Sequence, residues 1–292
     1  MTKSEWEYFS AFRENFREKC HEWLEEYSSV LKPLQIQAYQ NDGVPEYPLQ
    51  TPVVYNTVLD SFTKNSDIKL IVIGDNPGKD EQLEKNRSYL VGQSGKIAEG
   101  FFRKNPELEI DFRKNVIILN KTPVHTAKTK ELRFLGRQDE RLSDLIMTSQ
   151  LWMAEQTYAL QNALKCPVWI VGYAEIKDKG IFEPWRKKLE ELYTNNLTNT
   201  DTLKYDKNYD NLFVFQHFSM NRFLIDLKEA EKNMTGCTHG QKNIEGCWRN
   251  QHQLASELSP KKNMTPTLQE TLTYLGRCHK LELFSVPSSN MT

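Results

Sequence analysis

The segment Ile71-Val72-Ile73-Gly74-Asp75-Asn76-Pro77-Gly78 joins a short β-branched run to a turn. A continuous apolar run of this length is typical of a strand that is buried on both faces. The turn that follows carries polar groups past the carboxyl end of that strand. Because ligands of open α/β sheets bind at this edge, the segment predicts both a sheet and the place of a site.

Two further segments repeat this layout. Residues 116–119 form an apolar run that ends in Asn120, and residues 212–216 form another that ends in His217. Helical patterns lie between the strands, at residues 94–102, 143–164 and 183–193. Such alternation predicts an α/β fold of three layers, α/β/α, with a short and mostly parallel four-stranded sheet.

The two ends of the chain show sequence patterns that differ from the strand and helix alternation between them. Ser4 and Glu7 have the spacing of a capping box, and aromatic residues then recur at helical spacing up to Pro33. We interpret this stripe as core, with a partner-binding face as the alternative. A short helix is expected at residues 53–62 and another at 266–278. We therefore expect a helical extension at 1–66 packed on the domain, an α/β domain at 67–232, and a polar extension at 233–292 in the same globule.

Composition narrows the class of protein. The net charge is −1, so attraction to nucleic acid has to come from a local patch. No run of apolar residues is long enough to span a membrane, and the N-terminus does not resemble a signal peptide. The five scattered cysteines are an odd number, which favours reduced thiols and a cytoplasmic protein. We expect a monomer without a cofactor.

The three strand ends resemble the motifs of the uracil-DNA glycosylase superfamily. Gly74-Asp75-Asn76-Pro77-Gly78 is similar to its first motif, in the Gly-x-Asn-Pro-Gly form of the mismatch-specific and single-strand-selective branches. Residues 89–95 (Tyr-Leu-Val-Gly-Gln-Ser-Gly) resemble the Pro-Phe-Val-Gly-x-Ala-Gly segment of the thermostable branch. Leu119-Asn120 matches the strand end that reads the base. Residues 217–222 resemble the closing His-Pro-Ser motif, with Phe218 in place of Pro, and 168–172 fit the additional strand.

This resemblance covers roughly residues 69–232 and implies a role for each strand end. Asn76 would hold the attacking water with its amide oxygen. Asn120 would pair with the N3–H and O4 edge of uracil, which cytosine does not match. His217 would donate a hydrogen bond to O2 as charge develops on the departing base. The alternatives are a turn-stabilising Asn76, an Asn120 that satisfies loop backbone, and a structural His217.

The base-binding set implied by the resemblance also includes Gly74, Asp75 and Gly78. The uracil-specific branch has Tyr at the position of Gly78, and the smaller residue leaves space that favours looser base selection. The alternative is that glycine is needed there for a backbone conformation that only Gly adopts. The resemblance puts Leu90 where an aromatic residue normally supports the base. We prefer the neighbouring Tyr89 for stacking.

Contacts to DNA are expected from two places. The run that follows Asn120 is basic, and we assign phosphate contacts to Lys121, Lys128 and Lys130, with solvated surface as the alternative. Met220, Asn221 and Arg222 follow His217 where related enzymes push a wedge into the base stack.

The sequence thus predicts a monofunctional DNA glycosylase that uses water to remove uracil or a related deaminated base. A superfamily member that binds nucleic acid without cleaving it is one alternative. An unrelated nucleotide-binding α/β enzyme is the other. The four cysteines of the thermostable branch's iron–sulfur cluster have no counterpart here. Cys237, His239, Cys247 and His252 have irregular spacings for zinc, and we expect no metal.

Overall fold

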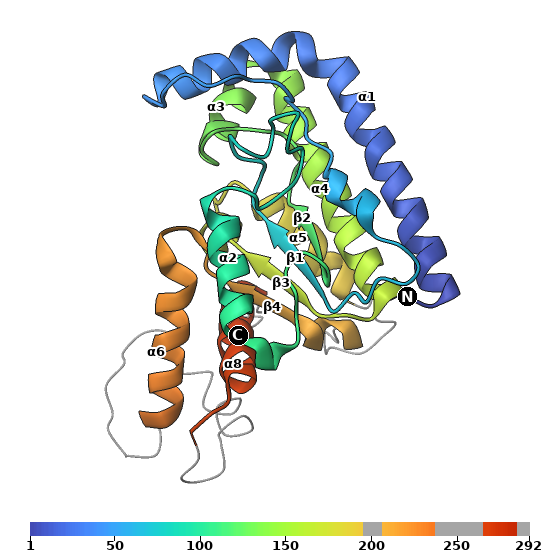
Figure 1. Ribbon diagram of the computed structural model, residues 1–292. Coiled ribbons are helices and arrows are strands. Elements are labelled where there is room, and N and C mark those ends of the chain that lie inside the picture. Colours follow the sequence, from blue (N-terminus) through green and yellow to red (C-terminus); the bar gives the residue numbers. More distant parts are fainter. Residues whose placement is uncertain (195–205, 237–264, 285–292) are drawn as a thin grey trace, which may run out of the picture.

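The computed structural model describes residues 1–194, 206–236 and 265–284. Four parallel strands form one sheet, in the order β2-β1-β3-β4 (Figure 1). The strands are β1 (Leu70–Gly74), β2 (Val116–Asn120), β3 (Val168–Val171) and β4 (Leu212–Phe215), and all their residues are buried. The predicted three-layer α/β fold is confirmed, and every pairing in the sheet is parallel.

One face of the sheet is covered by α2 (Gln93–Lys104), α6 (Arg222–Gly236) and α8 (Leu268–Leu283). Aromatic rings make this layer. The ring of Phe102 in α2 stacks on Trp169 of β3 at 5.5 Å, and Phe223 of α6 meets Phe215 of β4 at 5.5 Å. Gly276 lets α8 approach β4 closely, because a Cβ there would lie 2.7 Å from that of Phe213.

The opposite layer contains α4 (Glu140–Leu164) and α5 (Glu183–Tyr193), with α3 (Glu131–Gln138) and α1 (Lys3–Asn41) packed on α4 (Figure 1). The ring of Trp152 in α4 meets the rings of Phe16 and Trp23 of α1 at 5.6 and 5.9 Å. The aromatic stripe of the first helix is therefore core.

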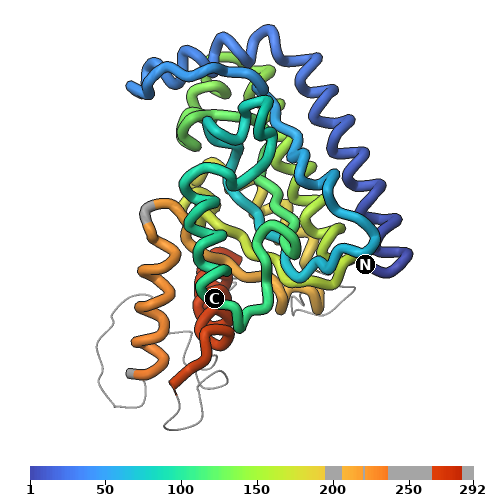
Figure 2. The backbone as a smooth tube through the Cα atoms, viewed as in Figure 1, coloured from blue at the N-terminus to red at the C-terminus, as the bar shows by residue number. Residues whose placement is uncertain are grey.

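The limits of α1 differ from those predicted. Thr2 and Glu5 form its capping box, and the helix continues through Pro33 to Asn41. Proline removes one hydrogen bond from a helix interior, and Figure 2 shows α1 bending along its course. The turns beyond Pro33 persist because they bury Gln35, Ala38 and Tyr39. Tertiary burial thus offsets the lost hydrogen bond.

Other boundaries were also predicted incorrectly. The segment 53–62 contains only a 3₁₀ turn, η1 (Thr57–Ser61), because Val53 pairs with Val124 instead of entering a helix. The helix α3 lies in the basic run after Asn120, where no helix was predicted. Further 3₁₀ turns are η2 (Pro106–Leu108), η3 (Tyr173–Ile176), η4 (Lys207–Asn211) and η5 (Ser219–Asn221). Among the described helices, none combines the length and apolar character that crossing a membrane requires.

Candidate functional site

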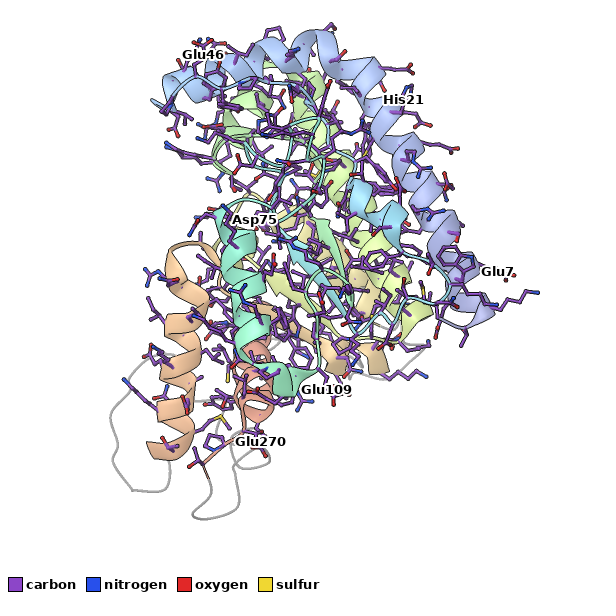
Figure 3. All side chains as sticks on the ribbon, viewed as in Figure 1. Glu7, His21, Glu46, Asp75, Glu109 and Glu270 are labelled. Carbon is purple, nitrogen blue, oxygen red and sulfur yellow. The ribbon has the colours of Figure 1, made fainter. Side chains whose placement is uncertain are left out.

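The sheet register brings the predicted strand ends to one edge. Gly74 of β1 pairs with Asn120 of β2, and Val171 of β3 pairs with Phe215 of β4. Asn76, Asn120 and His217 therefore all follow the carboxyl ends of parallel strands. Figure 3 labels Asp75, which lies between Gly74 and Asn76, at the edge toward which the strand arrows point. Side chains near this edge form the candidate site.

The amide of Asn76 has its orientation fixed by its neighbours. Its Nδ2 donates to Thr126 Oγ1 at 2.9 Å and approaches the carbonyls of Pro77 and Val124 at 3.4 Å. The Thr126 hydroxyl donates its own proton to Lys128 O at 3.0 Å, so towards Asn76 it only accepts. A flipped amide would direct its oxygen at three acceptors. Asn76 Oδ1, which receives no hydrogen bond from the described residues, is thus left free to accept a hydrogen bond from a ligand.

Asn120 ends β2 with an unsatisfied amide. Its residue is 2% exposed, and its buried Nδ2 finds no hydrogen-bond partner among the described residues. Leaving a buried donor unpaired is costly, which makes the atom a candidate for a ligand contact. Gly74 is required beside it, because any Cβ at that position would overlap Asn120 Oδ1. This close approach gives Gly74 a structural role in the site.

His217 presents one ring nitrogen to the site. The Ser219 backbone N–H donates to His217 Nδ1 at 3.2 Å, and Ser219 Oγ lies 2.8 Å from the same atom. Since Nδ1 is an acceptor, the proton of the neutral ring is on Nε2. Burial lowers the pKa of His217, with Asp75 opposing the shift, so the ring is neutral at pH 7. His217 Nε2–H is therefore a neutral donor.

Lys121 is not the predicted phosphate contact. Its side chain is fully buried, and its Nζ donates to Asp75 Oδ1 and Val171 O at 2.7 Å and to Gly74 O at 3.2 Å. Burial lowers the pKa of Lys121, and Asp75 opposes that shift. Gly172, at φ +101°, leaves the room that Asp75 occupies. The ammonium group thus ties three strand ends together.

Neither residue predicted to stack on the base is available. Tyr89 is 1% exposed and its hydroxyl donates to Val54 O, while Leu90 is 4% exposed with a left-handed φ of +52°. The reason is Glu81, whose buried carboxylate accepts from Leu90 N at 2.9 Å and from Gly78 N at 3.1 Å. This bridge folds the segment inward, and burial raises the pKa of Glu81 to about 7.

The space at Gly78 agrees with the steric interpretation of that glycine. A Cβ at Gly78 would meet nothing within 4 Å, and Gly78 is not among the residues with positive φ. The alternative, a backbone conformation that only glycine adopts, does not apply. A Cβ at this position would therefore fit without moving the backbone.

The remaining residues predicted to contact DNA form two groups, one in ion pairs and one exposed at the start of α6. Lys128 and Lys130 are exposed, but both form ion pairs with Asp42, whose pKa they lower. Asn221 and Arg222 are exposed next to η5, and Asn221 has a left-handed φ of +55°. The Met220 side chain lies outside the described residues. Arg222 is thus the freest cation of the predicted set.

Exposed cations gather on the segments that follow the strand ends. They lie in the turn after β1, in the first turn of α2, around η3 after β3, and at the start of α6. Within the part of the chain that the structure describes, no carboxylate pairs with any of them. They are Lys79, Lys96, Lys177, Lys179 and Arg222.

Two residues of the site were missed from the sequence. His125 is fully buried, with Nδ1 2.8 Å from Pro77 O and Nε2 2.8 Å from the Tyr47 hydroxyl. Thr126, next to it, orients Asn76. Their apolar-flanked position shortly after Asn120 was the available signal, but their partners lie about fifty residues away in the sequence.

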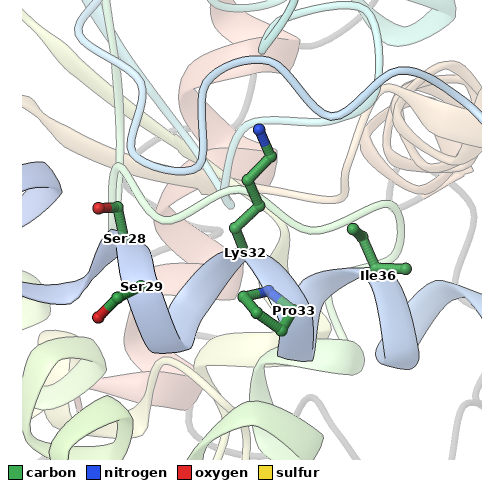
Figure 4. A pocket seen from close by; sticks show the side chains of 5 residues that line it. All are labelled: Ser28, Ser29, Lys32, Pro33 and Ile36. Carbon is green, nitrogen blue, oxygen red and sulfur yellow. The ribbon is translucent and has the colours of Figure 1, made fainter.

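No metal site emerges from the described residues, since no three His, Cys, Asp or Glu side chains gather in a suitable group there. Cys237, His239, Cys247 and His252 lie outside those residues. Figure 4 shows the side chains of α1 that line a pocket, and none of these residues comes from the strand ends. They are Ser28, Ser29, Lys32, Pro33 and Ile36.

In comparisons with known proteins, no family model, no curated protein and no solved structure matches the chain.

Proposed function

We propose that the protein is a DNA glycosylase that hydrolyses the N-glycosidic bond of uracil, or of a related deaminated base, with water as the nucleophile. One observation carries the proposal. Three strand-end side chains at one edge each keep a hydrogen-bonding atom without a partner among the described residues: Asn76 Oδ1, Asn120 Nδ2 and His217 Nε2. The set combines the acceptor oxygen of one amide, the donor nitrogen of another amide and the donor N–H of a neutral imidazole.

Each atom suits one step of the reaction. Asn76 Oδ1 accepts a hydrogen bond from water and orients it, although an amide does not take up the proton as a carboxylate would. Asn120 pairs with the edge of the base. His217 Nε2–H donates to the base oxygen on which negative charge develops. Asp75 is excluded as the base because Lys121 holds its Oδ1.

Lys121 also supports a monofunctional reaction. A lyase step requires a free amine that attacks the sugar. The Lys121 ammonium instead donates to three acceptors and is 0% exposed. Lys121 is therefore not such an amine, and water is the attacking group that we propose.

The exposed cations support DNA as the substrate. Lys79, Lys96 and Arg222 flank the strand ends from different segments, so a phosphate backbone would meet positive charge on several sides of the base pocket. Such contacts position a nucleic acid without reading its sequence. Because the chain has a net charge of −1, attraction to DNA has to come from local positive charge of this kind.

The test is formation of abasic sites in oligonucleotides that contain uracil, 5-substituted uracils, hypoxanthine, xanthine or a thymine mismatch, as single and double strands. Uracil should be excised, and the space at Gly78 should admit some 5-substituted uracils. Asn120→Asp should weaken the preference for uracil over cytosine. Salt-sensitive binding without excision of any base would identify a non-catalytic binding protein instead.

A further inference from the structure

The C-terminal half of α1 reaches the strand-end loops. Gln35 is buried there, and its Nε2 donates to His125 O at 2.7 Å and to Pro52 O at 3.0 Å. One turn further, the ring of Tyr39 packs on that of Tyr47 at 4.7 Å. The Tyr47 hydroxyl in turn lies 2.8 Å from His125 Nε2. Two sets of contacts, one through Gln35 and one through Tyr39 and Tyr47, therefore connect α1 to His125.

His125 in turn contacts the motif that contains Asn76. Its Nδ1 lies 2.8 Å from Pro77 O, and a carbonyl only accepts, so the ring proton is on Nδ1. Nε2 then accepts from the Tyr47 hydroxyl. Burial lowers the pKa of His125 to about 4, which keeps the ring neutral at pH 7.

The bonds fix one peptide plane from both sides. His125 holds the oxygen of the Pro77–Gly78 peptide, and Glu81 Oε2 accepts from its N–H at 3.1 Å. The proline ring fixes φ at Pro77, so rotation of this peptide plane is the main conformational freedom left to the turn. Asn76 lies immediately before it, and its amide is bonded to the loop that contains His125.

We propose that α1 is a working part of the site, in which Gln35 and His125 are positioning residues that fix the Pro77 carbonyl and through it Asn76. The inference rests on the proposed function, because it gives the N-terminal helix a role in that reaction. A glycosylase needs its water-holding amide placed to a fraction of an ångström. A long helix packed on α4 supplies a rigid support for that purpose.

The first experiment compares two buried glutamines. Gln35→Leu removes the bonds to His125 and Pro52. Gln161→Leu removes the bond from Nε2 to Asn208 O at 3.0 Å and the acceptor of the Tyr193 hydroxyl, near η4 at the amino edge of the sheet. Both substitutions should destabilise the fold. Only Gln35→Leu should lower the single-turnover excision rate, by about tenfold, with little change in binding to abasic product DNA. Equal rates in the two variants would overturn the inference.

The second experiment uses rescue. His125→Leu removes the shortest of the hydrogen bonds to Pro77 O, which also accepts from Thr126 N at 3.3 Å, whereas the amide nitrogen of His125→Asn takes a place close to that of Nδ1. We expect about a tenfold lower rate for the leucine variant and a rate within about threefold of wild type for the asparagine variant. Equal loss in both would assign His125 to packing alone.

A third measurement is independent of catalysis. The side-chain amide resonance of Asn76, assigned by its absence in Asn76→Asp, should shift in Gln35→Leu and His125→Leu but not in Gln161→Leu. An unchanged resonance overturns the positioning role whatever the excision assay shows. A wild-type protein that excises no base while the resonance shifts would overturn the proposed function and leave α1 as the support of this turn.

Discussion

The two edges of the parallel sheet differ in the polar side chains that they hold without partners. At the amino edge, Lys114 pairs with Asp111 at 3.4 Å, and Lys69 lies 3.8 Å from both Asp67 and Glu109. At the carboxyl edge, exposed cations such as Lys79 and Lys96 have no carboxylate partner among the described residues. Exposed cations without an ion pair are not confined to that edge, since Lys165 and Lys207, which precede β3 and β4, have none among the described residues either. What distinguishes the carboxyl edge is that Asn76, Asn120 and His217 keep polar atoms there without a described partner.

Removing the donor of His217 should produce the largest effect. Loss of one preorganised donor to a developing anion lowers a rate by about 10²–10³. His217→Ala should reduce single-turnover excision by that factor and leave the affinity for abasic product nearly unchanged. His279→Ala is the matched control, because His279 is also a buried histidine but bonds Val214 O at 3.2 Å. A loss below about threefold in His217→Ala would assign that residue to structure and remove the distinction between the edges.

The pH dependence of stability should report on His125. The folded pKa is about 4 and the usual value is 6.5, so the unfolded chain binds the proton more readily. The contribution of His125 to stability is therefore fully present above about pH 6.5 and is lost as the pH drops towards 4, by roughly 3 kcal/mol for a shift of this size. Urea unfolding at pH 7 and pH 4.5 measures it.

In that experiment His125→Asn should show a flatter decline than wild type, since it has no ring to protonate. Replacing the exposed His21 by Asn should leave the decline unchanged. Parallel curves for wild type and His125→Asn would show that His125 does not resist protonation.

Thr126 should matter through the orientation of Asn76. Thr126→Val removes the acceptor of Asn76 Nδ2 and lets the amide turn. We expect about a tenfold lower excision rate, with recovery in Thr126→Ser. Thr122→Val is the control, because the Thr122 hydroxyl is equally buried and bonds Ser149 at 2.7 Å. Similar rates for the two valine variants would disconnect Thr126 from Asn76.

Substitutions of the exposed cations at the carboxyl edge should have the smallest effect. Lys79→Gln and Lys96→Gln should each weaken binding to DNA a few-fold and reduce the slope of log affinity against log salt by about one. Lys114→Gln, at the amino edge, should change neither quantity. Titrations at several salt concentrations measure both. Equal effects of all three substitutions would mean that the free cations do not mark a binding face.

The strands could be predicted from the sequence because buried parallel strands are short apolar runs with a polar break at the end. Residues 70–74, 116–120 and 212–215 show this pattern locally, and parallel pairing then places their ends at one edge. The positions of Asn76, Asn120 and His217 followed from that alone. The helix α5 has the predicted limits for a similar reason, since Pro at its start and an amphipathic pattern define it.

Only the tertiary structure decided what each polar residue contacts. Lys121 in a basic run looks exposed, but Asp75 and two carbonyls from β1 and β3 draw it into the interior. Tyr89 is buried because Glu81 bonds the neighbouring backbone. Pro33 fails to end α1 because the turns beyond it bury their apolar face. Local pattern fixes strands and helices, whereas the partners of a buried charge or ring come from segments distant in the chain, which no local pattern contains.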